Sequence, residues 1–192
     1  MPKQVDHQAR RTQIADALVR VAAEQGLEAV SLRHVAAAAD VSTGMVQHYF
    51  RTKDEMMGFA MAVVRERNQE RITGRMSRLG PEPGPRELLR TLIAGVLPLD
   101  DESRAYGRVA LAFLAYTAVR PAAGDPLRKD TEELLGFVTD LIRAGGKASD
   151  PAGAAAGLLA VMEGLGVHLL AGHFTPERAI GALDTHLDLL FP

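Results

Sequence analysis

Residues 31–53 read SLRHVAAAADVSTGMVQHYFRTK, and this stretch predicts two short helices joined by a tight turn. Ser31 is a favourable helix N-cap, and the apolar residues that follow it recur at helical spacing. Ser42 can cap a second helix, which places Val46, Tyr49 and Phe50 inward and leaves polar side chains on its outer face. Two such helices form the helix-turn-helix pattern, whose second helix enters the DNA major groove. We therefore predict a DNA-binding unit in this part of the chain.

The composition is that of an ordinary globular chain, with 47% hydrophobic and 24% charged residues among 192. No cysteine occurs, which excludes disulfides, thiolate metal sites and cysteine nucleophiles. The net charge is −2, but residues 1–53 hold seven basic and five acidic side chains, and residues 54–192 hold 15 and 19. This mild asymmetry agrees with nucleic-acid binding by the N-terminal part without establishing it. The N-terminus is polar and lacks the apolar segment of a signal peptide, so we expect a cytoplasmic protein.

The periodicity of the chain is helical throughout, and we predict an all-α fold. Residues 1–8 are expected to be a disordered tail, followed by a helix that ends at Gly26. We expect an N-terminal three-helix helix-turn-helix DNA-binding domain at residues 1–53 and a C-terminal helical bundle for ligand binding and dimerisation at residues 54–192. The helices predicted after the helix-turn-helix are residues 53–76, 86–96, 102–119, 125–144, 152–171 and 176–191.

The second helix of the pattern offers side chains that suit contact with DNA. Gln47 could pair with adenine through N6 and N7, and Thr43 could contact a thymine methyl group. Basic and tyrosine side chains around the unit are placed for phosphate, where contacts add affinity without sequence preference. A solvated position for His48 and a packing role for Tyr49 are the alternatives. The predicted DNA-binding residues are Arg10, Arg11, Arg33, Ser42, Thr43, Gly44, Met45, Gln47, His48, Tyr49 and Lys53.

Aromatic and methionine side chains on four predicted helices could line an apolar cavity for a small-molecule effector. Ordinary core packing is the alternative for each of them. Glu163 is a lone carboxylate on an apolar helix and would need a partner, either a structural one or a ligand. Arg104 could anchor an anionic effector or lie at the surface. The predicted pocket residues are Phe59, Arg104, Tyr106, Phe113, Tyr116, Phe137, Met162 and Glu163.

Residues 152–170 form an apolar segment that approaches membrane-spanning length. The segment contains Glu163 and His168 and is rich in Ala and Gly, so we interpret it as a buried helix and expect no membrane partner. Its small residues would let another helix approach closely, and with the last helix it could form a four-helix interface between two copies. Completion of the chain's own core is the open alternative. The predicted interface residues are Ala156, Ala160, Gly164, Leu183 and Leu187.

Motifs for catalysis do not occur in the sequence: there is no HExxH, no GxSxG and no glycine-rich phosphate loop. His168 and His173 are five residues apart, which is not the i, i+4 spacing of a metal-binding pair on a helix. We therefore expect no enzyme, no cofactor and no metal site. The expected partners are double-stranded DNA, a small-molecule effector and a second copy of the chain.

The stretch DVSTGMVQHYFRTKDEM, residues 40–56, resembles the DNA-binding signature of the TetR family of bacterial transcriptional regulators. The preceding segment through Ala39 has the spacing of that family's second helix, so the resemblance covers residues 11–56. The closing segments, AVMEGLGVHLLAG at 160–172 and TPERAIGALDTHLDLLF at 175–191, are similar to the dimerising end of the choline-responsive, BetI-like branch. The resemblance implies a homodimeric, ligand-responsive repressor that binds a palindromic operator.

Two residues depart from the family pattern. Asp40 stands where the turn usually has Gly, and Asp tolerates the left-handed backbone better than most residues. Gln47 replaces the common Tyr, which exchanges a phosphate-contacting group for a base-reading amide, so the operator of relatives cannot be carried over. In the mechanism that the resemblance implies, the effector favours a conformer whose two recognition helices no longer match the half-site spacing. The alternative function is a helical small-molecule binding protein whose helix-turn-helix does not engage DNA.

Overall fold

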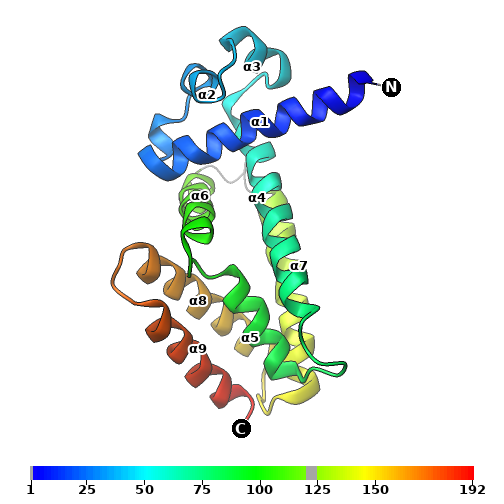
Figure 1. The fold of residues 1–192 in the computed structure, drawn as a ribbon. Coiled ribbons are helices and arrows are strands. Elements are labelled where there is room, and N and C mark those ends of the chain that lie inside the picture. The colour runs from blue at the N-terminus through cyan, green and yellow to red at the C-terminus, as the bar shows by residue number, and fades with distance from the viewer. Residues whose placement is uncertain (1, 120–124) are drawn as a thin grey trace. The chain divides into compact units, whose positions relative to one another are not determined.

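The computed structural model describes residues 2–119 and 125–192, without the side chains of residues 2–6, 27 and 125–127. Every regular element in those ranges is helical, so the predicted all-α fold is confirmed (Figure 1). In chain order the elements are α1 (Pro2–Gln25), the 3-10 turn η1 (Leu27–Ala29), α2 (Leu32–Ala38), α3 (Thr43–Tyr49), α4 (Lys53–Met76), α5 (Pro85–Val96), α6 (Asp101–Ala118), α7 (Asp125–Gly145), α8 (Pro151–Leu170) and α9 (Pro176–Leu190).

The first helix is longer than the sequence analysis predicted. It begins at Pro2, so the prediction of a disordered tail is wrong for residues 2–8. Proline suits the first helical position because its φ angle is already helical and its missing N–H would have had no partner there. At the other end, Gly26 ends the helix with a φ of 80°, as the prediction required.

The chain packs into two units. Among the described residues, unit 1 contains residues 2–67 and 105–119, and unit 2 contains residues 68–104 and 125–192. The chain passes from one unit to the other within α4, near the start of α6 and again between residues 119 and 125. These units are defined by packing alone, so the functional boundary expected between residues 53 and 54 stays a prediction.

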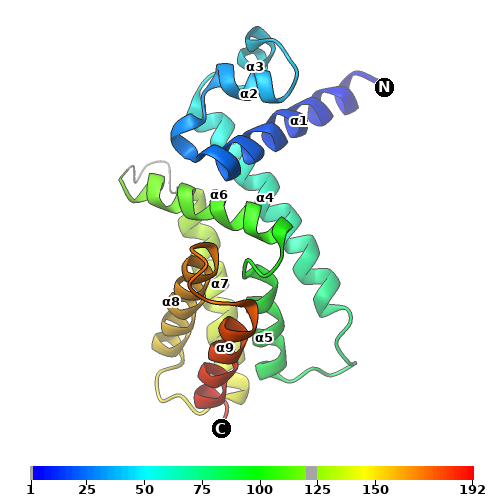
Figure 2. The ribbon, with the colours of Figure 1, turned by 60° about the vertical axis from the view of Figure 1, so that its left-hand side comes forward.

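The core of unit 1 joins α1, α2 and α3. α1 packs against α2, and α2 packs against α3 (Figure 2). Ile14 and Leu18 of α1, Val35 of α2 and Val46 of α3 are buried, and so is Phe50, which directly follows α3. Val46 and Phe50 thus occupy the inward positions that helical spacing predicted, whereas Tyr49 is only half-buried. The outer face of α3 is thereby set by burial of the opposite face.

The core of unit 2 is formed by four helices. α7 packs against α5 and α8, and α9 packs against α5 and α8. Its buried side chains are mainly aliphatic and come from all four helices; they include Leu89, Ile93, Val138, Ile142, Leu158, Leu169, Leu183 and Leu187. Burial of a Leu or Ile side chain contributes roughly 1.5–3 kcal/mol, so this cluster is the main source of stability in unit 2.

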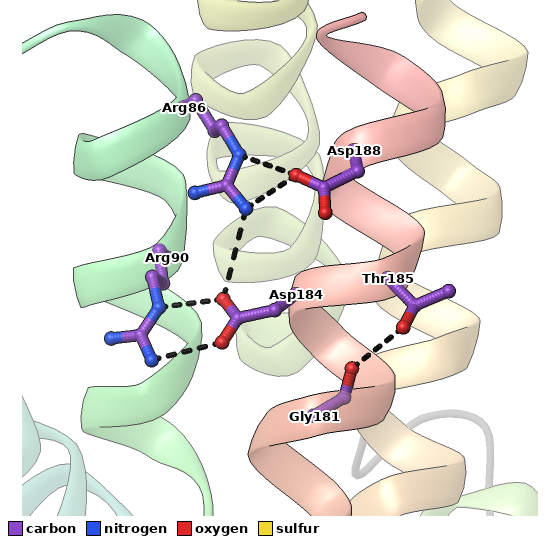
Figure 3. Close-up of polar contacts among 6 residues, drawn as sticks. All are labelled: Arg86, Arg90, Gly181, Asp184, Thr185 and Asp188. Carbon is purple, nitrogen blue, oxygen red and sulfur yellow. Dashed lines mark hydrogen bonds and ion pairs between the residues drawn. The ribbon is translucent and has the colours of Figure 1, made fainter.

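Ion pairs fix the register of α9 on α5 (Figure 3). Arg90 binds Asp184 through two hydrogen bonds, Nε to Oδ1 at 2.6 Å and Nη2 to Oδ2 at 3.0 Å. Arg86 donates to Asp188 Oδ1 from Nη2 at 2.6 Å. The hydrogen bonds from Arg90 lower the pKa of Asp184, and the same contact raises the pKa of Arg90. Because these groups are partly exposed, each pair is worth about 1 kcal/mol or less and serves mainly to align the helices.

In the described part of the chain, α8 is the one helix that is long and apolar enough to span a membrane. Five of its side chains are buried within unit 2: Ala155, Leu158, Leu159, Leu165 and Leu169. A core helix of a globular domain meets the same length and composition criteria, so α8 is weak evidence for a membrane span.

Candidate nucleic-acid interface

Both helices of the helix-turn-helix begin at the predicted serine caps. Ser31 Oγ accepts a hydrogen bond from the backbone N–H of His34 at 3.1 Å. Ser42 Oγ accepts one from the N–H of Met45, also at 3.1 Å. Each serine thereby satisfies one backbone donor that a helix start leaves without a partner inside the helix.

The turn between the two helices depends on a left-handed residue. Asp40 has a φ of 54°. The N–H of Asp40 donates to Ala37 O at 3.2 Å, and the N–H of Val41 donates to Ala36 O at 3.0 Å. This pair of bonds is the Schellman motif, which requires a left-handed residue where Asp40 stands. The predicted conformation of Asp40 is therefore confirmed.

Side chains of α1 complete the end of α2. Gln13 Nε2 donates to Ala39 O at 2.8 Å, and Arg20 Nη2 donates to Ala38 O at 2.8 Å. The last carbonyl groups of a helix have no partner inside it, so these two bonds satisfy them and tie the turn to α1.

We predict that Asp40→Gly stabilises the protein by up to about 1 kcal/mol, because glycine adopts the left-handed conformation without the strain that a Cβ causes. Asp40→Ala keeps the Cβ and should give no gain. Chemical denaturation followed by circular dichroism measures both variants. A lower free energy of unfolding for Asp40→Gly than for the parent would contradict the prediction.

The outer face of α3 carries the side chains predicted to contact DNA. Ser42, Gly44, Met45, Gln47 and His48 are exposed, with Met45 at 38%. Thr43 and Tyr49 are half-buried. A Cβ added at Gly44 would meet no atom closer than 4.0 Å, so packing inside the protein does not require glycine there.

The ring of Tyr49 contacts two histidine rings. The centroid of its ring is 4.6 Å from that of His7 in α1 and 5.2 Å from that of His48, both in edge-on arrangements. The contact with His7 was not predicted from the sequence, because residues 1–8 were expected to be disordered. Pro2, which suits a helix start, was the available signal.

The basic residues predicted to bind phosphate differ in their surroundings. Arg33 is exposed, and Arg10 is half-buried with its Nη1 donating to Gln13 Oε1 at 2.8 Å. Lys53 is half-buried and has an interaction within the protein. These placements leave their contact with DNA a prediction.

Arg11 is engaged inside unit 1. Its guanidinium lies 4.3 Å from the ring centroid of Phe59 and 5.1 Å from that of Phe50, and the two rings are 5.5 Å apart. Such cation–π contacts are worth roughly 0.5–2 kcal/mol, the higher values applying where water is excluded. Arg11 therefore links α1 to the end of α3 and to α4, a structural role that helical spacing alone does not indicate.

Two segments of the chain match models of known protein families. Residues 14–58 match the model of the bacterial regulatory proteins of the tetR family. Residues 85–192, more than half of the chain, match the model of the BetI-type transcriptional repressor C-terminal domain. The chain belongs to the TetR family. It is a DNA-binding transcriptional regulator, as the sequence analysis predicted.

Relatives of this TetR-family chain are similar along most of its length. The HTH-type transcriptional regulator PksA of Bacillus subtilis is 33% identical over 177 residues, which cover 88% of this chain and 83% of that protein. The HTH-type transcriptional regulator BetI of Burkholderia thailandensis is 32% identical over 195 residues, which cover 99% of this chain and 97% of that protein. The crystal structure of a transcriptional regulator from Rhodococcus sp. Rha1 is 31% identical with a TM-score of 0.85 and covers 94% of this chain and 95% of that one.

The start of α4 in this TetR-family protein is held by local and distant hydrogen bonds. Thr52 Oγ1 accepts from the N–H of Glu55 at 3.0 Å and thereby caps the start of the helix. Glu55 Oε2 accepts from the N–H of Arg51 at 2.9 Å, one residue earlier than a standard capping box requires. Tyr116 Oη of α6 donates to Asp54 Oδ1 at 2.5 Å. The first turn of α4, which follows α3 in the chain, is thus tied to α6.

The residues predicted to line a ligand pocket fall in both units. Unit 1 holds Phe59, Tyr106, Phe113 and Tyr116, and unit 2 holds Arg104, Phe137, Met162 and Glu163. In unit 1, Phe113 is buried, and its ring centroid lies 6.4 Å from that of Tyr116. In unit 2, Phe137 and Glu163 are exposed. Exposure lets water solvate the carboxylate of Glu163 in the single chain, and a partner for it from a second copy or a ligand stays a prediction.

The residues predicted to form a dimer interface separate into two groups. Ala156 and Ala160 of α8 are exposed, and Gly164 is half-buried. Leu183 and Leu187 of α9 are fully buried in the core of unit 2. For these two leucines, the structure shows the alternative that the sequence left open, completion of the chain's own core.

Proposed function

We propose that this TetR-family regulator is a repressor that binds a palindromic DNA operator as a homodimer, with α3 of each protomer in a major groove. The observation that carries this proposal is the two-sided character of α3. Val46 of α3 and Phe50, the residue directly after α3, are buried in the core on one side of the helix. Gln47 and His48 are exposed on the other side. The major groove admits a helix with such a polar face.

Gln47 is the proposed base-reading residue. Its amide can donate to N7 and accept from N6 of adenine at once, and a good two-bond contact of this kind discriminates by about 1–3 kcal/mol against the wrong base. Arg10 and Arg33 are proposed to contact phosphate, which strengthens binding to every sequence alike. Specificity and affinity are therefore assigned to different side chains.

Substitution of Gln47 tests the operator proposal. Gln47→Ala should weaken binding to the specific operator by about 5- to 150-fold and leave binding to random duplex nearly unchanged. Gln69→Ala, at an exposed position of α4, is the matched control and should bind like the parent. Fluorescence anisotropy with promoter fragments at several salt concentrations measures both affinities and the salt dependence. If every upstream fragment binds no tighter than random duplex, the operator proposal fails.

We further propose that exposed small residues of α8 form the centre of the dimer interface. Ala156 and Ala160 lie on the exposed side of this largely apolar helix and allow a second helix to approach closely. The family model that covers α8 and α9 is that of a BetI-type repressor, which supports this assignment. Leu183 and Leu187 are left out of the proposed interface because they are buried within the subunit.

Light scattering at micromolar concentration tests the dimer. The particle should have twice the 20.6 kDa mass of the chain. Ala160→Arg should give monomers, because a long charged side chain would be buried between the two helices. Ala62→Arg, at an exposed position of α4, should remain dimeric. A 20.6 kDa particle for the parent protein would overturn the dimer proposal.

The proposed regulatory step is a shift between two conformers of the dimer. A small-molecule effector acts only through its different affinities for these conformers. Within unit 1, the hydrogen bond from Tyr116 to Asp54 gives α6 a direct hold on the helix that follows α3. We infer that the protein works in the cytoplasm as a regulator and not as an enzyme, in agreement with its family.

A further inference from the structure

Two histidine side chains face each other where α8 ends. The Nδ1 atoms of His168, in the last turn of α8, and His173, in the connection to α9, are 3.2 Å apart. The carbonyl oxygen of His168 accepts hydrogen bonds from the N–H groups of His173 at 2.9 Å and Phe174 at 3.2 Å. Gly172, with a φ of 72°, reverses the chain between them. The chain reversal at the end of α8 thus brings together His168 and His173, which are five residues apart and would point in different directions on a continuous helix.

The ring of His168 is held in place by its neighbours. It stacks on Phe174 with the ring centroids 4.5 Å apart and an angle of 20° between the planes. The guanidinium of Arg178 lies 4.9 Å from the Phe174 centroid. Both histidines are exposed, so solvent and dissolved ions can reach them. The pair is therefore oriented by the protein and open on its outer side.

The distance between the two nitrogen atoms suits a metal chelate. Two neutral Nδ1 atoms with lone pairs pointing at each other repel, unless a proton or a metal ion lies between them. Zinc–imidazole bonds of about 2.0–2.1 Å in tetrahedral geometry place two ligand nitrogens about 3.3 Å apart. Within the described residues, no third His, Cys, Asp or Glu completes a group of metal ligands with them. Water can fill the remaining coordination positions.

We propose that His168 and His173 form a two-histidine chelate for a divalent transition metal of the class that prefers imidazole, with Zn²⁺ as the representative ion. Each histidine contributes Nδ1 and keeps its proton on Nε2. The metal ion would cross-link the end of α8 to the segment that leads into α9. This site does not depend on the operator or effector proposals, because it uses none of their residues.

Calorimetric titration of the untagged full-length protein with ZnCl₂ tests the proposal. His168→Ala and His173→Ala should each weaken Zn²⁺ binding by about ten-fold or more, because each removes one of the two protein ligands. His186→Ala, at a half-buried position of α9, is the control and should leave the affinity unchanged. The side chains of His168 and His173 are exposed and that of His186 is half-buried, and far-ultraviolet circular dichroism checks that each variant remains folded.

Nitrogen-15 spectra of the imidazole rings provide an independent readout. Addition of Zn²⁺ should shift the Nδ1 resonances of His168 and His173 and leave those of His186 in place. Zn²⁺ binding that is equally strong in a double variant carrying His168→Ala and His173→Ala would overturn the proposal, as would the absence of Zn²⁺ binding to the parent protein. So would Nδ1 resonances that report a shared proton and stay unchanged on addition of Zn²⁺.

Discussion

Replacing Phe50 by alanine is expected to lower the free energy of unfolding by about 3–5 kcal/mol, because it leaves a large cavity in the core of unit 1. Phe50 is fully buried, packs against Phe59 and lies under the guanidinium of Arg11. For a chain of this size the loss corresponds to a melting temperature lower by about 10 °C. Operator binding should also be lost, because Phe50 anchors the end of α3.

Phe137→Ala is the matched control for Phe50→Ala. Phe137 is 46% exposed and belongs to unit 2, so its truncation should change stability by no more than about 0.5 kcal/mol. Differential scanning calorimetry and anisotropy with operator DNA give the two readouts. A Phe50→Ala protein that melts and binds DNA like the parent would show that α3 is not anchored in this way.

Leu183→Ala is expected to cost about 2–5 kcal/mol through the cavity that it creates in unit 2. Leu183 has no exposed surface and belongs to the cluster formed by α5, α7, α8 and α9. Leu189 lies on the same helix with 74% of its surface exposed, and Leu189→Ala should cost at most about 0.5 kcal/mol. The comparison therefore separates burial from side-chain type.

Varying the protein concentration distinguishes packing of Leu183 within its own subunit from a role in association between subunits. If Leu183 packs within its own subunit, the destabilisation by Leu183→Ala should be the same at low and high protein concentration. A loss that grows on dilution would mean that the side chain supports association between subunits. Equal losses for Leu183→Ala and Leu189→Ala would contradict the assignment of Leu183 to the core.

Most of the fold could be predicted from periodicity and end signals. Gly26, Ser31, Ser42 and Thr52 act locally through backbone conformation or hydrogen bonds to residues a few positions away, so they can be recognised without the tertiary structure. The start of α1 was missed because residues 2–8 lack a strong apolar pattern. The helix there is indicated only by Pro2 and not by periodicity.

In the candidate site too, local features were predictable and contacts between distant residues were not. The outward placement of Gln47 and the left-handed turn at Asp40 follow from local pattern and were predicted. The engagement of Arg11 with two aromatic rings was not, because it joins residues about 40 or more positions apart. An arginine near the start of a helix looks equally suited to phosphate or to an aromatic partner until both neighbours are known.

The amino-acid sequence alone sufficed for the helical class, the helix-turn-helix and the TetR resemblance, because these depend on spacing along a single segment. The tertiary structure was required to place Leu183 and Leu187 in the core and not at the surface. It was also required to bring the nitrogens of His168 and His173 together. The physical reason is that an apolar stripe indicates which face of a helix is buried. It does not indicate whether the same chain or a second copy covers that face. A spacing rule likewise holds only while the helix continues.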